Sequence, residues 1–143
     1  MDENPCYYCG LAADTVDHVV PQSLLDAVRG SGDDALIAAV TRRRRTMVVP
    51  ACRECNMLAG AKYHETLDER ARYVRERLAH RHRKVLSMPD WSPSELAELS
   101  ANLRSLVIAG LVERDTVRRR LRWRAKGYTN PEASEWWAQD GAA

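Results

Sequence analysis

The chain has 143 residues, of which 45% are hydrophobic and 29% charged, and its formal net charge is +2. This composition is typical of a soluble, one-domain globular protein, because the length suffices for a hydrophobic core and no apolar run approaches the roughly 20 residues of a membrane span. The N-terminal residues lack the basic and apolar regions of a secretory signal, so we expect a cytoplasmic protein that has no membrane partner.

The charge is distributed unevenly along the chain. Residues 1–60 carry a net charge of −2 and residues 61–143 a net charge of +4. Basic side chains concentrate in residues 70–84, in residues 113–126 and in a run of four arginines at 42–45. Such blocks suit a polyanion such as DNA, although a solvated helix face explains any single block equally well.

All four cysteines fall into two Cys-x-x-Cys pairs, Cys6 with Cys9 and Cys52 with Cys55. Each pair supplies two thiolates from one short loop, and two pairs complete the tetrahedron that zinc prefers. Disulfide bonds are the alternative in a secreted chain, and a thioredoxin-like redox motif would account for one pair only. The pattern predicts a structural four-cysteine zinc site that encloses the 42 residues between the pairs.

Two short segments rich in β-branched residues lie inside this clamp. Residues 16–20 are predicted to form a strand that Pro21 ends, and residues 46–52 contain a second strand. A helix is expected to begin near the third cysteine and to run to about Gly60. The enclosed region therefore has the predicted order strand, strand, helix.

Asp17, His18 and Asn56 together offer the side chains of a metal-dependent hydrolase. Asp17 supplies a carboxylate oxygen and Asn56 an amide oxygen, and both are hard ligands that suit Mg²⁺ or Mn²⁺. The imidazole of His18 is a side chain that can take a proton from water near neutral pH. With a metal ion on the scissile phosphate, the three would form a phosphodiesterase site. Considered alone, the Asp-His pair is equally well explained as a capped turn with a surface histidine.

The order of these motifs resembles the HNH endonucleases of the ββα-metal (His-Me finger) superfamily, and in particular zinc-clamped members from bacteriophages and bacteria. Cys-x-x-Cys, Asp-His-Val-Val-Pro and Val-Pro-Ala-Cys-Arg-Glu-Cys-Asn follow one another within residues 5–62. The resemblance implies that His18 is the general base and that Asp17 and Asn56 hold the catalytic Mg²⁺ or Mn²⁺. It also implies that the four cysteines are ligands of a structural zinc ion, and that the protein acts in the cytoplasm of a bacterial or phage-infected cell.

The sequence departs from the family pattern at the middle motif position and after the final asparagine. The middle residue is often an asparagine that braces the loop near the general base, and Thr46 or Met47 stands there in this chain. A hydrogen bond from Thr46 or the backbone carbonyl could replace it. Many family members have a lysine shortly after the final asparagine. Here Lys62 comes later, within reach of a phosphate.

The loop between the two strands is long. Residues 22–45 are predicted to be an insertion with short helices at 23–28 and 33–40. The insertion ends in the arginine run, so we predict DNA contacts for a set of basic residues: Arg42, Arg43, Arg44, Arg45 and Lys62. A purely structural helical insert is the alternative.

The second half of the chain is predicted to be helical. A capping box starts a helix over residues 66–86, Ser-Pro-Ser-Glu starts another at residue 92, and a third covers residues 113–126. Gly110 is placed where the second of these helices ends, and the leucines at helical spacing are expected to pack in the core. The tail adds two tryptophans that dock on these helices or on a partner: Trp136 and Trp137.

These observations predict an α+β fold that is mostly α, with a ββα-metal core and zinc site in residues 1–64 and a helical extension packed on it in residues 65–143. The predicted function is hydrolysis of DNA phosphodiester bonds, by nicking or with weak sequence specificity. One metal and one base per protomer cut one strand, so double-strand cleavage would require a homodimer or two encounters. The alternative is a zinc-stabilised DNA-binding module, or an accessory to phage DNA-packaging proteins, with little catalysis.

Overall fold

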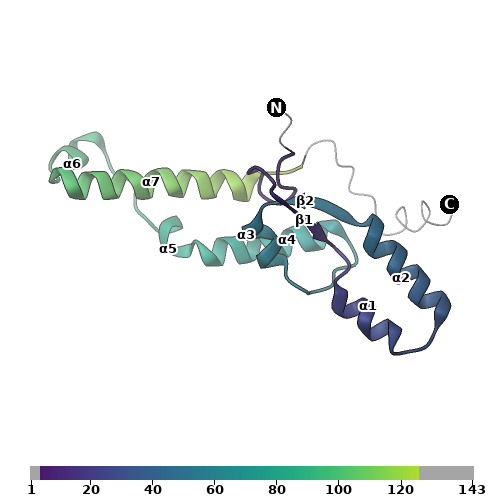
Figure 1. Cartoon of the computed structure of the whole chain (residues 1–143). Coiled ribbons are helices and arrows are strands. Elements are labelled where there is room, and N and C mark those ends of the chain that lie inside the picture. The colour runs from purple at the N-terminus through teal and green to yellow at the C-terminus, as the bar shows by residue number, and fades with distance from the viewer. Residues whose placement is uncertain (1–3, 126–143) are drawn as a thin grey trace.

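The computed structural model describes residues 4–125, which are mostly helical and include a two-stranded antiparallel sheet (Figure 1). The coarse prediction of a mostly helical α+β fold is therefore confirmed. Trp136 and Trp137 lie outside the described residues. No described helix combines the length and the apolar character needed to cross a membrane. The elements follow in this order: β1 (Thr15–His18), α1 (Gln22–Arg29), α2 (Asp34–Thr46), β2 (Val48–Ala51), α3 (Arg53–Ala59), α4 (Leu67–Arg81), α5 (Arg83–Leu86), α6 (Pro93–Ala97) and α7 (Ala101–Arg122).

The small sheet is formed by β1 and β2 and leads directly into α3. In the register of the two strands, Asp17 lies opposite Val49 and His18 opposite Val48. Because successive side chains of a strand point to opposite faces, Asp17 is buried and His18 is exposed. Cys52 caps α3, because its sulfur accepts a hydrogen bond from the backbone N–H of Cys55. The predicted order of strand, strand and helix is thus present, although β1 ends at His18.

The insertion between the strands is a pair of helices, α1 and α2, that projects from one end of the sheet (Figure 1). Asp33 caps α2, because its side chain accepts a hydrogen bond from the backbone N–H of Leu36. The helix was expected to end at residue 40 but continues to Thr46, since arginine has a high helix propensity and nothing in the run breaks the helix. The four arginines therefore lie on the last turns of α2 and point in different directions.

An apolar stripe along α4, with residues spaced three or four positions apart, is buried and joins the core. Thr66 caps the helix, as the capping box predicted. One cluster of buried side chains includes the cysteines, both strands, α3 and α4, so the first and second halves of the chain share a core. The helix expected to reach residue 86 ends at Arg81, and α5 begins after His82. The buried apolar residues of α4 are Leu67, Ala71, Val74 and Leu78.

The prediction of two helices separated at Gly110 is wrong. α7 is one helix of 22 residues that Ser100 caps, and Gly110 lies within it. A Cβ atom at Gly110 would lie 2.7 Å from Sδ of Met88, so the glycine permits close packing of the preceding segment on α7. The prediction that Leu103 and Leu106 pack in the core is also wrong, because their side chains are 53% and 69% exposed. The N-terminal half of α7 extends beyond the core (Figure 1).

Candidate functional site

The four cysteines of the two Cys-x-x-Cys pairs meet in the interior. All four are buried, and their sulfur atoms lie within 4.8 Å of one another. Sγ of Cys9 and Sγ of Cys52 are 3.7 Å apart, which matches the edge of about 3.8 Å in a tetrahedron with Zn–S bonds of about 2.3 Å. This cluster of described residues could bind a metal ion such as zinc. It confirms the prediction that the two pairs converge.

Backbone hydrogen bonds and one glycine shape the first cysteine loop. The N–H of Cys6 donates to the carbonyl of Leu11 at 2.6 Å, and the N–H of Gly10 donates to the carbonyl of Cys6 at 3.0 Å. Gly10 has a φ of 80°, and a Cβ atom there would lie 2.6 Å from the ring of Trp123. The loop therefore needs glycine both for its turn and for its contact with the residue that follows α7.

Close packing of the sulfurs changes their acidity. Hydrogen bonding from Cys55 lowers the pKa of Cys52 to about 6, whereas the same pair of sulfurs raises the pKa of Cys55. Hydrogen bonds from the other sulfurs also lower the pKa of Cys9, so the thiolate form is favoured at both Cys9 and Cys52. Thiols this close cannot all ionise without a cation, and a bound metal ion would displace the remaining protons.

A second group of candidate residues lines a cavity beside β1. A cavity of about 290 Å³ is lined by residues of β1, α1, α2 and α3, and these include Asp17, His18, Arg44 and Asn56. The cavity brings together the three residues that the sequence proposed as a hydrolytic trio. The imidazole of His18 is exposed to solvent at this cavity.

Hydrogen bonds orient the amide of Asn56. Its Nδ2 donates to Oγ1 of Thr15 at 3.2 Å and to the carbonyl of Val16 at 3.2 Å. Both partners are acceptors, so this end of the amide is the nitrogen. The Oδ1 atom of Asn56 accepts no hydrogen bond from the described residues and is available to a hard cation.

Asp17 is held by Arg70 and Tyr8. Nε of Arg70 donates to Oδ2 at 2.7 Å, Nη2 donates to Oδ1 at 2.9 Å, and the hydroxyl of Tyr8 donates to Oδ2. Burial and the charge of Asp17 raise the pKa of Tyr8, which therefore stays protonated. A carboxylate has about four acceptor positions, so one remains on Oδ1. Asp17 as a metal ligand stays a prediction, and a metal ion would have to share the carboxylate with Arg70.

Arg70 is a site residue that the sequence analysis missed. It is fully buried and links β1 to the segment after α3, because Nη1 donates to the carbonyl of Lys62 at 2.6 Å and Nη2 to that of Gly60 at 3.3 Å. Gly60 also lines the cavity. The available signal was position: Arg70 lies between Leu67 and Val74 on the apolar stripe of α4, where an arginine indicates a buried ion pair.

Replacing Arg70 by methionine is expected to destabilise the protein by about 3–5 kcal/mol, because Asp17 would remain buried without its partner. Urea unfolding followed by circular dichroism measures the effect. Arg72→Met is the matched control on an exposed position of the same helix, with an expected change within about 0.5 kcal/mol. Equal stability of the two variants would contradict the structural role of the ion pair.

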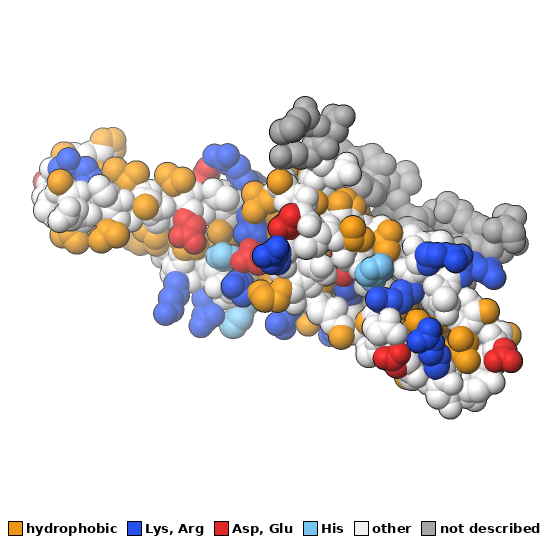
Figure 2. All heavy atoms as spheres, viewed as in Figure 1, with side chains coloured by type: hydrophobic (Ala, Val, Ile, Leu, Met, Phe, Trp, Pro, Cys, Tyr) orange, Lys and Arg blue, Asp and Glu red, His pale blue; other side chains and the backbone are white. Residues whose placement is uncertain are grey.

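The four arginines of α2 have different surroundings. Arg43 is 4% exposed, and its Nη2 donates to the carbonyl of Glu65 at 3.1 Å. Arg44 is half-buried at the cavity, where its Nη1 donates to the carbonyl of Val20 at 2.6 Å. Arg42 and Arg45 are exposed, and Figure 2 shows basic side chains gathered over α2 on this face. Arg43 therefore stabilises the fold, and we retain the other three as candidate DNA contacts.

The backbone of Met47 holds the end of β1. Its carbonyl accepts a hydrogen bond from the N–H of Val19 at 3.0 Å, directly after His18. The hydroxyl of Thr46 instead donates to the carbonyl of Arg42 in its own helix at 3.0 Å. The side chain of Thr46 therefore bonds within its own helix, and the group that contacts the segment after His18 is the backbone carbonyl of Met47.

Lys62 lies beside α4. Its Nζ is 4.5 Å from the centre of the Tyr73 ring, in a cation–π contact. Its predicted contact with phosphate stays a prediction.

Comparison with known proteins finds no match to this chain among family models, curated proteins or solved structures.

Proposed function

We propose that the protein is a metal-dependent endonuclease of the HNH type that hydrolyses phosphodiester bonds of DNA. The observation that carries this proposal is the cavity in which His18 and Asn56 lie together with Asp17. The three residues belong to a strand–strand–helix unit, and the four-cysteine cluster includes Cys55, which directly precedes Asn56. The motif order in the sequence is a second, independent reason for the same assignment.

In this proposal His18 takes a proton from the attacking water, since its imidazole is exposed at the cavity. Oδ1 of Asn56 and the remaining acceptor position on Oδ1 of Asp17 would hold a Mg²⁺ or Mn²⁺ ion. The ion would polarise the scissile phosphate and offset its developing charge. Arg44 lines the same cavity and is placed to contact a neighbouring phosphate.

The cysteine cluster has a structural part in the proposal. Zinc bound there would fasten the first cysteine loop to the start of α3, and the helix N-cap would be one of its ligands. Because Asn56 directly follows Cys55, the zinc site would fix the position of the proposed ligand of the catalytic ion.

A second candidate function is a zinc-stabilised DNA-binding module with little catalysis. The observation that favours it is the ion pair between the buried Arg70 and Asp17. This pair places a positive charge next to the carboxylate that would bind the catalytic ion. This candidate predicts DNA binding without cleavage. Assembly with phage packaging proteins is implied by the sequence resemblance, and a homodimer is one way in which a protein with one metal and one base per protomer could cut both strands.

The test is cleavage of supercoiled plasmid by purified protein in Mg²⁺, in Mn²⁺ and in EDTA, with bound zinc quantified in the same preparation. Relaxed or linear plasmid that requires the added ion supports the nuclease. Retained zinc and measurable DNA binding without cleavage under any ion would contradict it and favour the binding module.

The exposed Arg45 is expected to contribute to DNA binding through a phosphate. Replacing it by glutamine should reduce the slope of log affinity against log salt by about 0.9, the value for one phosphate contact. Fluorescence anisotropy with labelled duplex over a salt series measures the slope. Arg43→Gln is the matched control: it removes the same charge from a buried position, so it should lower thermal stability and leave the slope unchanged. The reverse pattern would contradict the assignment of both residues.

A further inference from the structure

The C-terminal end of α7 lies against the cysteine cluster. Arg120, on the last turn of α7, is 6% exposed, and its Nη2 lies 4.0 Å from Sγ of Cys52 and 4.0 Å from Sγ of Cys55. The same nitrogen pairs with Oε1 of Glu54 at 2.5 Å. A buried guanidinium therefore stands between a carboxylate and two sulfurs of the candidate zinc site.

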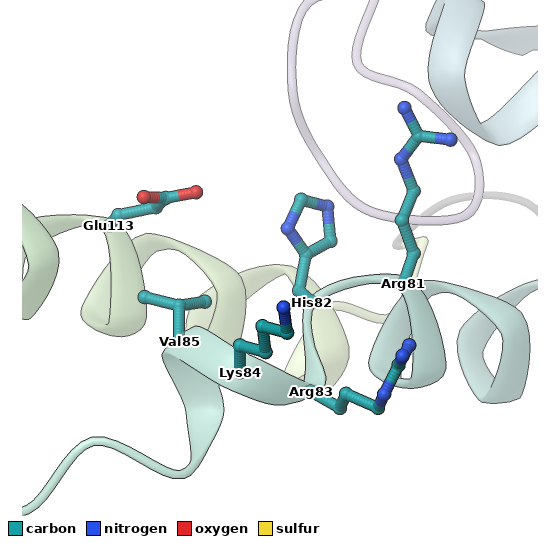
Figure 3. Close-up of a pocket in the computed structure, with 6 residues that line it drawn as sticks. All are labelled: Arg81, His82, Arg83, Lys84, Val85 and Glu113. Carbon is teal, nitrogen blue, oxygen red and sulfur yellow. The ribbon is translucent and has the colours of Figure 1, made fainter.

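Glu54 joins three helices at this point. From its position on α3, its Oε2 pairs with Nε of Arg81 at 3.0 Å and with Nε2 of His82 at 3.0 Å. Burial would raise the pKa of Glu54, but the hydrogen bonds and charges of Arg120 and His82 lower it, so the carboxylate is ionised at neutral pH. Figure 3 shows Arg81 and His82 projecting to the same side of the α4–α5 junction, next to α7. The carboxylate thus holds Arg120 in place.

A cavity of about 470 Å³ opens between this junction and α7 and is lined by Arg81, His82, Lys84 and Glu113, among others. Two of these side chains, Arg81 and His82, form ion pairs with Glu54. Glu113 is the acidic residue of the lining. Arg81 and His82 therefore help to anchor α4 to α3 through Glu54.

We infer that Arg120 is an outer-sphere residue of the metal site, which strengthens zinc binding and ties α7 to the zinc-binding loops. Four thiolates carry more negative charge than one Zn²⁺ ion offsets, and a guanidinium at two of the sulfurs compensates part of the remainder. Outer-sphere partners of this kind typically change metal affinity by about 10–100-fold. The inference depends on the cysteines binding zinc and does not depend on nuclease activity.

The experiment is competition between the full-length protein and a chromophoric zinc chelator, for the wild type and two variants. Arg120→Gln is expected to bind zinc about 10–100-fold more weakly. Arg114→Gln is the matched control, because Arg114 is a buried arginine of the same helix that bonds instead to the carbonyl of Met88 at 2.6 Å and to Asp90 at 2.6 Å. It should disturb the packing of α7 and leave zinc affinity within about twofold of the wild type.

A spectroscopic measurement separates an effect on the sulfurs from a general loss of packing. In cobalt-substituted protein, Arg120→Gln is expected to move the sulfur-to-cobalt charge-transfer band to longer wavelength, because the sulfurs lose a positive neighbour and donate charge more readily. Arg114→Gln should not move the band. Equal zinc affinities and equal bands in the two variants would overturn the inference. A wild-type protein that binds neither metal would overturn the zinc site as well, and neither result depends on DNA cleavage.

Discussion

His18→Ala is expected to lower the rate of metal-dependent plasmid cleavage by about 10²–10⁴-fold, the usual contribution of a general base. The physical reason is that the imidazole of His18 is the exposed proton acceptor of the cavity shared with Asn56. Single-turnover cleavage at saturating Mg²⁺ or Mn²⁺ measures the loss in the chemical step. DNA affinity should change little, because alanine leaves the arginines of α2 in place.

The variant should remain folded, since an exposed side chain at the end of a strand contributes within about 0.5 kcal/mol to stability. Zinc content and thermal unfolding of the variant verify this. His80→Ala is the matched control, because His80 is another exposed histidine and lies on α4. A cleavage rate of His18→Ala within a few-fold of the wild-type rate would contradict the assignment of His18 as the general base.

Removal of zinc is expected to unfold the region around the sheet. The apparent free energy of structural zinc binding in small zinc domains is about 10–16 kcal/mol, which equals or exceeds the total stability of about 5–15 kcal/mol that is usual for a domain. The four cysteines lie in the shared core and join the first loop to the start of α3, so removing the metal would leave four close thiols in the interior without the ion that links them. Thermal unfolding by circular dichroism, with and without a zinc chelator, measures the effect.

Cys55→Ser should reproduce the result of chelation without a chelator, because it removes one buried ligand. Zn²⁺ added back to chelated wild type should restore the transition, and Mg²⁺ should not, since a thiolate site selects the softer ion. Zinc affinity should also fall as the pH falls, because protons compete for thiolates such as that of Cys52, whose pKa lies at about 6. An unchanged transition in metal-free protein would contradict a structural role for the cluster.

Local signals in the sequence predicted the local features well. The spacing of the cysteines predicted their convergence. Thr66 and Ser92 were recognised as helix caps, and both act as caps in the structure. Each of these features depends on residues within one turn of helix or on the strong preference of thiolates for a metal ion.

Predictions that required knowledge of the neighbours were less successful. Four consecutive arginines are indistinguishable by composition, yet α2 turns Arg43 inward and leaves Arg45 exposed. Gly110 has the signature of a helix end, but its missing side chain makes room for Met88 inside a continuous helix. In both cases the outcome depends on which segment packs against the residue.

Side-chain chemistry and short-range backbone preferences were sufficient to predict the two cysteine pairs, the strand–strand–helix order and the positions of Asp17, His18 and Asn56 within it. No local pattern indicated that Arg70 binds the carboxylate of Asp17 or that Arg120 reaches the cysteine sulfurs. Both contacts join residues more than 50 positions apart in the chain. The partner of a buried charge is set by the packing of whole helices, since a charge without a partner in the interior would cost several kcal/mol.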